Sequence, residues 1–126
     1  MTYEAIVTFS FSIPRQFGGK AQTNLAELLE KIEAADVSLL SISGFASGRR
    51  IKIFCTPKNP AKLEAFLKSA KLRAKKTEAL QITAAKQIDA VAVLHKIALS
   101  GYDIAAFDVF GISSRSGGFI WSEKPG

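Results

Sequence analysis

The stretch Leu28-Leu29-Glu30-Lys31-Ile32 recurs 65 residues later as Val93-Leu94-His95-Lys96-Ile97. The residues that follow the two stretches also match, at an offset of 67. They are Asp36-Val37, the turn Ser47-Gly48-Arg49-Arg50 and Ile53-Phe54 in the first copy, and Asp103-Ile104, the turn Ser114-Arg115-Ser116-Gly117-Gly118 and Ile120-Trp121 in the second. Two residues were therefore gained after the helical part. Such a repeat indicates an internal duplication, so we predict that the chain consists of two copies of one small α/β unit.

Length and composition suit a globular protein. The chain has 126 residues, of which 48% are hydrophobic and 22% charged, enough for one compact domain or two fused modules. No apolar run approaches the roughly 20 residues that cross a bilayer, and the start Met1-Thr2-Tyr3-Glu4 does not resemble a signal peptide. A single cysteine, Cys55, excludes an internal disulfide. We therefore expect a cytoplasmic protein without a membrane span.

The net charge of +6 raises the question of an anionic partner. Much of the excess lies in the run from Lys68 to Lys76. This run is read as a solvated helix end leading into an exposed strand, where cations also suit the helix dipole. No aromatic residue interrupts it, so the stacking platform of a sheet-type RNA binder is missing. Nucleic-acid binding is the least favoured of the functions considered.

Periodicity predicts the first strand and the first helix. Residues 4–12 alternate apolar and polar side chains as a strand does, until Ile13-Pro14 stops regular pairing. A long loop then leads to a helix that Thr23 or Asn24 can cap. The apolar stripe predicted for this helix consists of Leu25, Leu28, Leu29 and Ile32.

Two further strands and a second helix complete the first copy. Strands are predicted at 36–46 and 50–56, joined by a tight turn in which Gly48 supplies a positive φ. Asn59 can cap the second helix and Pro60 suits its first position. The residues expected to be buried on this helix are Leu63, Phe66, Leu67 and Ala70.

The segment from Leu72 to Thr83 has to serve both copies. It is long enough for one extended strand, which must close the first unit and open the second. The second helix is predicted over 87–100 and ends before Gly101, and strands follow near 103–112 and 118–122. We therefore expect a first unit over 1–71 and a second over 72–126 that lacks its closing helix.

This element order is that of a ferredoxin-like βαββαβ fold, an α/β (α+β) architecture with antiparallel sheets. It resembles the tandem ACT-domain family of small-molecule-binding regulatory domains. The resemblance covers nearly the whole chain and also rests on Leu25-Ala26-Glu27-Leu28-Leu29, on Asp36-Val37 and Asp103-Ile104, and on Gly117-Gly118-Phe119-Ile120-Trp121. It implies two fused ACT-like units that share the central long strand.

The resemblance also implies a function and a site. Members bind amino acids or related effectors at interfaces between ACT units, so we expect a non-catalytic regulatory or sensor protein, forming a homodimer. The ligand-binding residues implied are Pro14, Arg15, Gln16, Phe17, Gly18, Gly19, Lys20, Asn24 and Asp36 in the first copy. Those implied in the second copy are Gln87 and Asp103, with Lys86 and Asp89 beside them.

The loop from Arg15 to Lys20 also suits a ligand on physical grounds. Gly18-Gly19 lets backbone N–H groups approach a ligand, and a following helix N-terminus favours a carboxylate. The alternative is a loop whose glycines only ease a turn. Two arginines at the hairpin tip, Arg49 and Arg50, could clamp an anion but are more simply solvated. The loop does not have the spacing of a phosphate-binding P-loop.

Nothing in the sequence favours catalysis or a cofactor. His95 is the single histidine, and no nucleophile motif accompanies it. One histidine and one cysteine cannot form a closed zinc site. Phe119 and Trp121 are more simply core residues of a strand. The alternative to a ligand-binding regulator is an interaction module that uses its sheet for oligomerisation without a small molecule.

Overall fold

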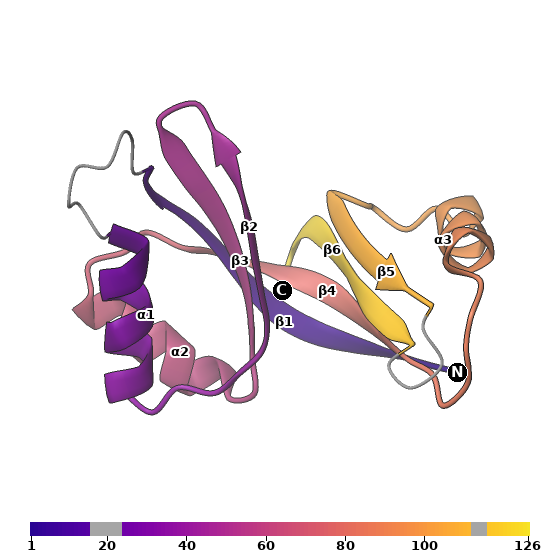
Figure 1. Cartoon of the computed structure of the whole chain (residues 1–126), viewed down its shortest axis with the longest axis horizontal. Helices are drawn as coiled ribbons and strands as arrows, with labels where there is room; N and C mark the ends of the chain where they lie inside the picture. The colour runs from indigo at the N-terminus through magenta and orange to yellow at the C-terminus, as the bar shows by residue number, and fades with distance from the viewer. Residues whose placement is uncertain (16–23, 112–115) are drawn as a thin grey trace. The chain divides into compact units, whose positions relative to one another are not determined.

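The computed structural model describes residues 1–15, 24–111 and 116–126 (Figure 1). In this part of the chain, six strands and three helices alternate in an α+β arrangement. The elements are β1 (Thr2–Pro14), α1 (Asn24–Ala34), β2 (Leu39–Ser47), β3 (Arg50–Pro57), α2 (Pro60–Ser69), β4 (Lys75–Thr83), α3 (Ala90–Leu99), β5 (Ala106–Phe110) and β6 (Gly117–Pro125).

The strand order is β2-β3-β1-β4-β6-β5. Strand β4 therefore lies between β1, the opening strand of the first copy, and β6, a strand of the second. The prediction that one strand closes the first βαββαβ unit and opens the second is confirmed. Each copy places its strands in the same order, β2-β3-β1 in the first and β5-β6-β4 in the second.

The chain divides into two compact units. One comprises Thr8–Lys76, and the other combines Met1–Val7 with Thr77–Gly126. The single strand β1 thus begins in one unit and ends in the other. Because its first residues lie beside β4, the second unit has four strands although its own repeat supplies only three.

The core of the Thr8–Lys76 unit lies between its strands and its two helices, which are on one side of the strands (Figure 1). Antiparallel pairing sets Phe9 opposite Cys55 and Phe11 opposite Ile53, so apolar side chains of β1 and β3 share a face. The buried apolar side chains of this unit are Phe9, Phe11, Ile13, Leu28, Ile32, Val37, Ile53, Phe54, Cys55, Leu63, Phe66 and Leu67. Burial of each large side chain contributes roughly 1.5–3 kcal/mol.

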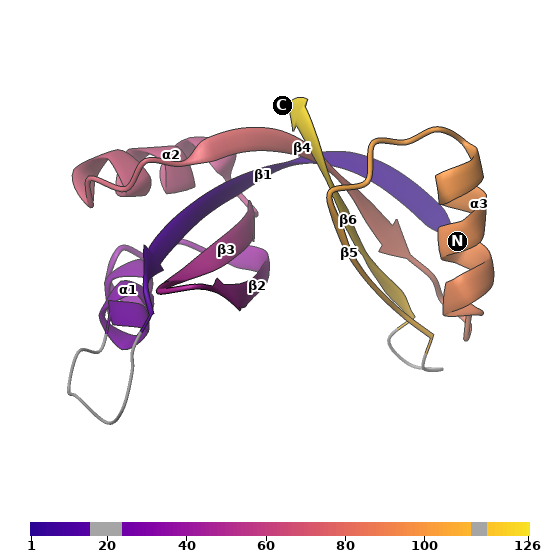
Figure 2. The ribbon, with the colours of Figure 1, turned by 90° about the horizontal axis from the view of Figure 1, so that it is seen from above.

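Helix α3 lies beside the strands of the second unit (Figure 2), and the core there is smaller. Its buried cluster consists of Ile82, Val93, Ile97 and Ile120, with Leu80, Ile88, Leu94, Tyr102, Ile104 and Val109 packed around it. Strand β6 pairs with β4 and β5 and carries Ile120, which is fully buried. Within the described residues of this unit, α3 is the one helix.

The helix ends locate the two residues gained in the second copy. Beyond α1, Asp36 has a φ of +55°, and beyond α3, Gly101 has a φ of +81°. Both are left-handed residues after a helix, where glycine is the usual choice. Asp36 N–H donates to Glu33 O (3.0 Å), and Gly101 N–H donates to Ala98 O (3.3 Å). The offset of 65 therefore holds through the helix end, so that Asp36 matches Gly101 in the structure and not Asp103, as the sequence comparison had it. The two extra residues, Tyr102 and Asp103, directly follow Gly101.

Several predicted boundaries differ from the structure. Strand β2 begins at Leu39 instead of 36, β4 at Lys75 instead of 72, and β5 spans Ala106–Phe110 instead of 103–112. Two further differences have a local physical reason. Strand β1 continues through Pro14, which is opposite Arg50. The next bond is donated by Arg15 N–H, so Pro14 occupies a non-hydrogen-bonded pair that needs no N–H. Helix α3 begins at Ala90 instead of 87, because the Asp89 carboxylate caps it by accepting from Val91 N–H and Ala92 N–H (3.1 and 3.2 Å).

Candidate functional site

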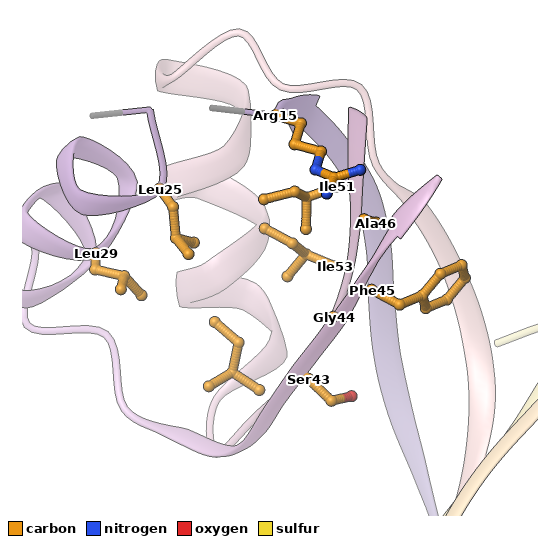
Figure 3. Close-up of a pocket in the computed structure, with 10 residues that line it drawn as sticks. Arg15, Leu25, Leu29, Ser43, Gly44, Phe45, Ala46, Ile51 and Ile53 are labelled. Carbon is orange, nitrogen blue, oxygen red and sulfur yellow. The ribbon is translucent and has the colours of Figure 1, made fainter. Parts of the chain in front are cut away.

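A groove of about 400 Å³ lies between α1 and strand β2 in the Thr8–Lys76 unit (Figure 3). We name it groove 1. It is lined by Arg15, Leu25, Leu29, Ile42, Ser43, Gly44, Phe45, Ala46, Ile51 and Ile53. Its volume is within the range of roughly 300–1,000 Å³ that is usual for small-molecule pockets.

The apolar stripe of α1 is wider than the sheet can cover, and this forms one wall. Leu28 and Ile32 are buried, whereas Leu25 and Leu29 each remain 38% exposed. Figure 3 shows Leu25 and Leu29 extending from the helix into the groove, with Ile51 and Ile53 of β3 on the facing wall. Exposed leucines one helical turn apart therefore face an apolar surface across an open space.

Strand β2 forms the floor of the groove, and Gly44 leaves space above this strand because it has no side chain. Gly44 is opposite Ile53 on the neighbouring strand, on the face directed at α1. A Cβ atom at Gly44 would lie 3.5 Å from Ile51 Cγ2 and 3.6 Å from Ile53 Cγ1. A side chain at this position would therefore fill the groove. The Phe45 ring points away (Figure 3) and stacks on Phe54, with ring centroids 6.2 Å apart.

Arg15 gives one end of groove 1 a positive charge. Its backbone N–H donates to Arg49 O (2.7 Å) and its Nη1 donates to Gly48 O (3.4 Å) at the β2–β3 turn. These bonds hold the guanidinium beside Ile51 and Ala46 (Figure 3). Of the described residues that line groove 1, Arg15 alone is charged. Apolar walls with one cationic end suit a small anion that has an apolar body.

A related groove, groove 2, lies in the second unit. It has a volume of about 270 Å³ and is lined by Ala90, Val91, Leu94, Phe107, Asp108 and Val109. Ala90 and Leu94 correspond to Leu25 and Leu29 at the helical offset of 65, and Val109 corresponds to Ile42 at the strand offset of 67. The duplication therefore includes the groove between helix and outer strand as well as the secondary structure.

Comparison with solved structures identifies the fold. The chain is similar to the protein BT0572 from Bacteroides thetaiotaomicron, with a TM-score of 0.72 and 16% identity over 94% of this chain and 79% of that one. It is also similar to the ligand-free regulatory subunit of aspartate kinase from Thermus thermophilus, with a TM-score of 0.61 and 14% identity over 98% and 89%. The regulatory subunit of the Thermus flavus aspartate kinase matches with a TM-score of 0.54 and 13% identity over 95% and 84%.

The fold is a tandem ACT-like fold. No protein-family model matches the sequence, and no curated protein matches it. At identities of 11–16% the structural matches establish the architecture alone. They confirm the α+β, ferredoxin-like arrangement of two ACT-like units that the duplication predicts.

The structure places the predicted site residues of the first ACT-like unit in different surroundings. Gln16, Phe17, Gly18, Gly19 and Lys20 lie outside the described residues, and Asn24 is the first residue of α1. Pro14 is exposed at the end of β1, and Arg15 lines groove 1. Asp36 lies elsewhere: its carboxylate is 3.7 Å from Lys62 Nζ, and its side chain is 96% exposed.

The predicted residues of the second ACT-like unit do not line groove 2. Gln87 is exposed in the connection between β4 and α3. Asp103 Oδ2 accepts from Ser122 Oγ (3.1 Å) and Glu123 N–H (3.3 Å), so it ties the start of the β5 segment to β6. Asp89 caps α3. These two carboxylates have hydrogen-bonding roles within the fold.

The sequence did not single out the apolar lining of groove 1. Leu25 and Leu29 belong to the predicted apolar stripe of the first helix, and Ile42, Ile51 and Ile53 are apolar residues of predicted strands. The available signal was the width of the α1 stripe, in which Leu25, Leu28, Leu29 and Ile32 occupy four of eight consecutive positions. Gly44 in the middle of a strand was a second signal, since such a glycine often marks a close approach.

The reactive side chains considered in the sequence do not form a site. Cys55 is fully buried, and burial raises the pKa of its thiol to about 12, so it stays protonated and unreactive. His95 is exposed on α3. Within residues 1–15, 24–111 and 116–126, no three His, Cys, Asp or Glu side chains are grouped to hold a metal. The helices of this same part are too short or too polar to cross a membrane.

Proposed function

We propose that this chain is a non-catalytic regulatory or sensor protein that binds an amino acid in groove 1. The observation that carries this proposal is the position of Arg15, a cation at the end of an apolar groove of about 400 Å³. The carboxylate of the ligand would pair with the guanidinium, and the side chain would contact Leu25, Leu29 and the strands. Binding would order the surroundings of the groove and shift the assembly or partner contacts of the protein.

The fold supports a regulatory role. The Thermus thermophilus and Thermus flavus proteins that it resembles are regulatory subunits of aspartate kinase. Because a shared fold does not by itself carry function, we base the proposal on the groove and treat the analogy as support. The single buried cysteine fits the reducing cytoplasm, which we propose as the site of action.

We further propose that two copies of the chain pair so that the ligand lies at an interface between ACT-like units. Strand β2 borders groove 1 and is at one end of the strand order formed by the described residues. Its outer edge can accept a strand from a second copy. Such a partner would cover the open side of the groove and reduce the solvent around the Arg15–carboxylate pair.

The proposed function can be tested by screening the twenty amino acids at millimolar concentration by thermal shift, followed by calorimetry. Saturable binding of one of them, weakened in an Arg15→Gln variant, is the expected result. The absence of binding by all twenty amino acids would contradict the assignment of amino-acid binding.

An assembly module without a small-molecule ligand is the second candidate. It is favoured by the exposed apolar residues of β2, where Leu40, Ile42 and Phe45 are 46%, 43% and 52% exposed. Large apolar side chains on an outer strand are typical of interaction surfaces. Light scattering after size-exclusion chromatography distinguishes the two candidates. A dimer that an Ile42→Lys variant abolishes, in a protein that binds no amino acid, would favour assembly alone.

A further inference from the structure

We infer that groove 1 selects a carboxylate with a large aliphatic or aromatic side chain, and that groove 2 does not bind it, so that each chain takes up one ligand. This inference rests on the proposed function for the site and adds to it a ligand class and a stoichiometry. It is based on a position-by-position comparison of the two copies.

Among the described residues, the positive end of groove 1 has no counterpart in the second copy. Arg15 N–H donates to Arg49 O (2.7 Å), and the equivalent bond in the second unit runs from Ala84 N–H to Ser116 O (3.2 Å). The strand pairing agrees, because Pro14 is opposite Arg50 and Thr83 is opposite Gly117. The three arginines at 15, 49 and 50 thus correspond to Ala84, Ser116 and Gly117.

The described lining of groove 2 holds no cation. Its charged member, Asp108, lies beside Val109 on β5, and Val109 packs against the core under α3. Side chains alternate along a strand, so Asp108 belongs to the face directed away from α3. Among the described residues that line groove 2, a carboxylate therefore meets no counterpart of Arg15.

The space that corresponds to the floor of groove 1 is obstructed in the second copy. Gly111 corresponds to Gly44 at the strand offset of 67. A Cβ atom at Gly111 would come within 2.1 Å of Ile88 O, in the connection that leads to α3. At Gly44 the nearest atom is Lys52 O at 3.0 Å, which belongs to the neighbouring strand. The space above the glycine is thus occupied by backbone in the second copy, and groove 2 is the smaller of the two, at about 270 Å³.

The walls of groove 1 select an apolar side chain. Facing Arg15 along the groove are Leu25, Leu29, Ile42, Ile51 and Ile53, and none of these offers a polar side-chain atom. Ser43 also borders the groove, but its hydroxyl points away from Leu25 and Leu29 (Figure 3). A hydroxyl, amide or ammonium group placed among them would lose water without gaining a partner. A branched aliphatic or aromatic side chain would gain contact with both walls. Leucine, isoleucine and phenylalanine are therefore the expected class, and lysine and threonine are disfavoured.

The test is calorimetric titration of the whole chain with leucine, isoleucine, phenylalanine, threonine and lysine. The same titrations use 4-methyl-2-oxopentanoate, which keeps the carboxylate and apolar tail of leucine, and isoamylamine, which lacks a carboxylate. The expected result is binding of at least one apolar carboxylate at one per chain. Its affinity should exceed that for threonine and lysine by about tenfold or more, and isoamylamine should not bind.

Two pairs of variants locate the ligand. Arg15→Gln should weaken binding by about tenfold or more, the usual effect of losing a charged hydrogen-bond donor, whereas Arg49→Gln removes the same charge outside the groove and should have little effect. Leu29→Gln should weaken binding by about tenfold, whereas Leu94→Gln alters the equivalent wall of groove 2 and should leave affinity unchanged. Circular dichroism of each variant verifies that it is folded.

The outcomes separate this inference from the proposed function. Binding of lysine or threonine alone would overturn the inference and leave an amino-acid sensor standing. Binding of the oxo acid alone would support the inference and overturn amino-acid sensing. Two ligands per chain, equal losses in Leu29→Gln and Leu94→Gln, or no binding of any carboxylate would each overturn the inference.

Discussion

Arg15 and Ala84 occupy equivalent positions in the two copies of the duplicated unit. The backbone N–H of Arg15 donates to Arg49 O, directly before β3, and that of Ala84 donates to Ser116 O, directly before β6. The backbone geometry is thus alike in the two copies, whereas the side chain is a cation in one and a methyl group in the other. A duplicated fold needs both copies for its sheet. The site that we propose in groove 1 needs a cation in only one of them.

Gly118 is expected to be indispensable to the second unit. It has a φ of +155°, and a Cβ atom there would lie 2.1 Å from Asp108 O and 2.8 Å from Val109 Cα on the paired strand. Gly118→Ala should therefore lower the free energy of unfolding by more than about 3 kcal/mol, since backbone has to move. Urea denaturation provides the measurement.

Gly48→Ala is the matched control for Gly118. Gly48 has a φ of +61° but has open space where a Cβ atom would be. The free energy of unfolding of the Gly48→Ala variant should fall by only about 1–2 kcal/mol, because alanine is strained in the left-handed conformation. Equal losses of unfolding free energy in the two variants would show that the close approach of β5 to Gly118 does not cause the loss in Gly118→Ala.

Lys71 is a site where stability can be gained. It follows α2 with a φ of +58°, a conformation that glycine adopts without strain. Lys71→Gly should raise the free energy of unfolding by about 0.5–1 kcal/mol. Lys68→Gly, inside the same helix, should lower it by about 1 kcal/mol. A loss in both variants, measured by thermal unfolding, would contradict this account of the helix end.

The small core of the second unit should be sensitive to truncation. Ile120 is fully buried in the cluster beneath α3, whereas Val91 on that helix is 78% exposed. Ile120→Ala should cost about 2–5 kcal/mol, and Val91→Ala should change stability by less than about 0.5 kcal/mol. An Ile120→Ala variant as stable as the parent in urea would mean that this cluster is not the core of the unit.

Cys55 makes stability depend on alkaline pH. Burial raises the pKa of its thiol from 9.0 to about 12. The folded state therefore holds the proton more tightly than the unfolded chain. The resulting stability is complete below pH 9.0 and is lost as the pH rises toward about 12. A Cys55→Ala variant should lose less stability than the parent over this range.

Thiol labelling gives an independent measurement on Cys55. At about pH 8 an aromatic disulfide reagent should fail to modify the native protein and should react at once in concentrated urea, because the thiolate is the reactive form. Rapid labelling of the native protein would contradict the burial of this thiol.

The repeat allowed much of this fold to be predicted. The offset between Leu28-Leu29 and Val93-Leu94, together with the single strand from Leu72 to Thr83, led to the strand order with β4 in the middle. The boundary at Pro14 was harder to predict. Whether proline ends a strand depends on which residues form hydrogen-bonded pairs, and that is a property of the register with β3.

The candidate site was predictable only in part. Arg15 was selected from its loop, because charge beside glycines is a recognisable local pattern. Leu25 and Leu29 were not, because an apolar helix stripe looks the same whether the sheet covers it or leaves it open. Their exposure depends on how far β2 lies from α1, a tertiary distance that periodicity does not encode.

The most direct test of the central claim is methyl NMR of protein labelled at Ile, Leu and Val, because both grooves are lined by these residues. During titration with leucine, isoleucine, phenylalanine and 4-methyl-2-oxopentanoate, the account predicts saturable shifts of the Leu25, Leu29 and Ile42 methyl signals. The Leu94 and Val109 signals of groove 2 should stay unchanged. Shifts of equal size in both sets, or in neither, would contradict it.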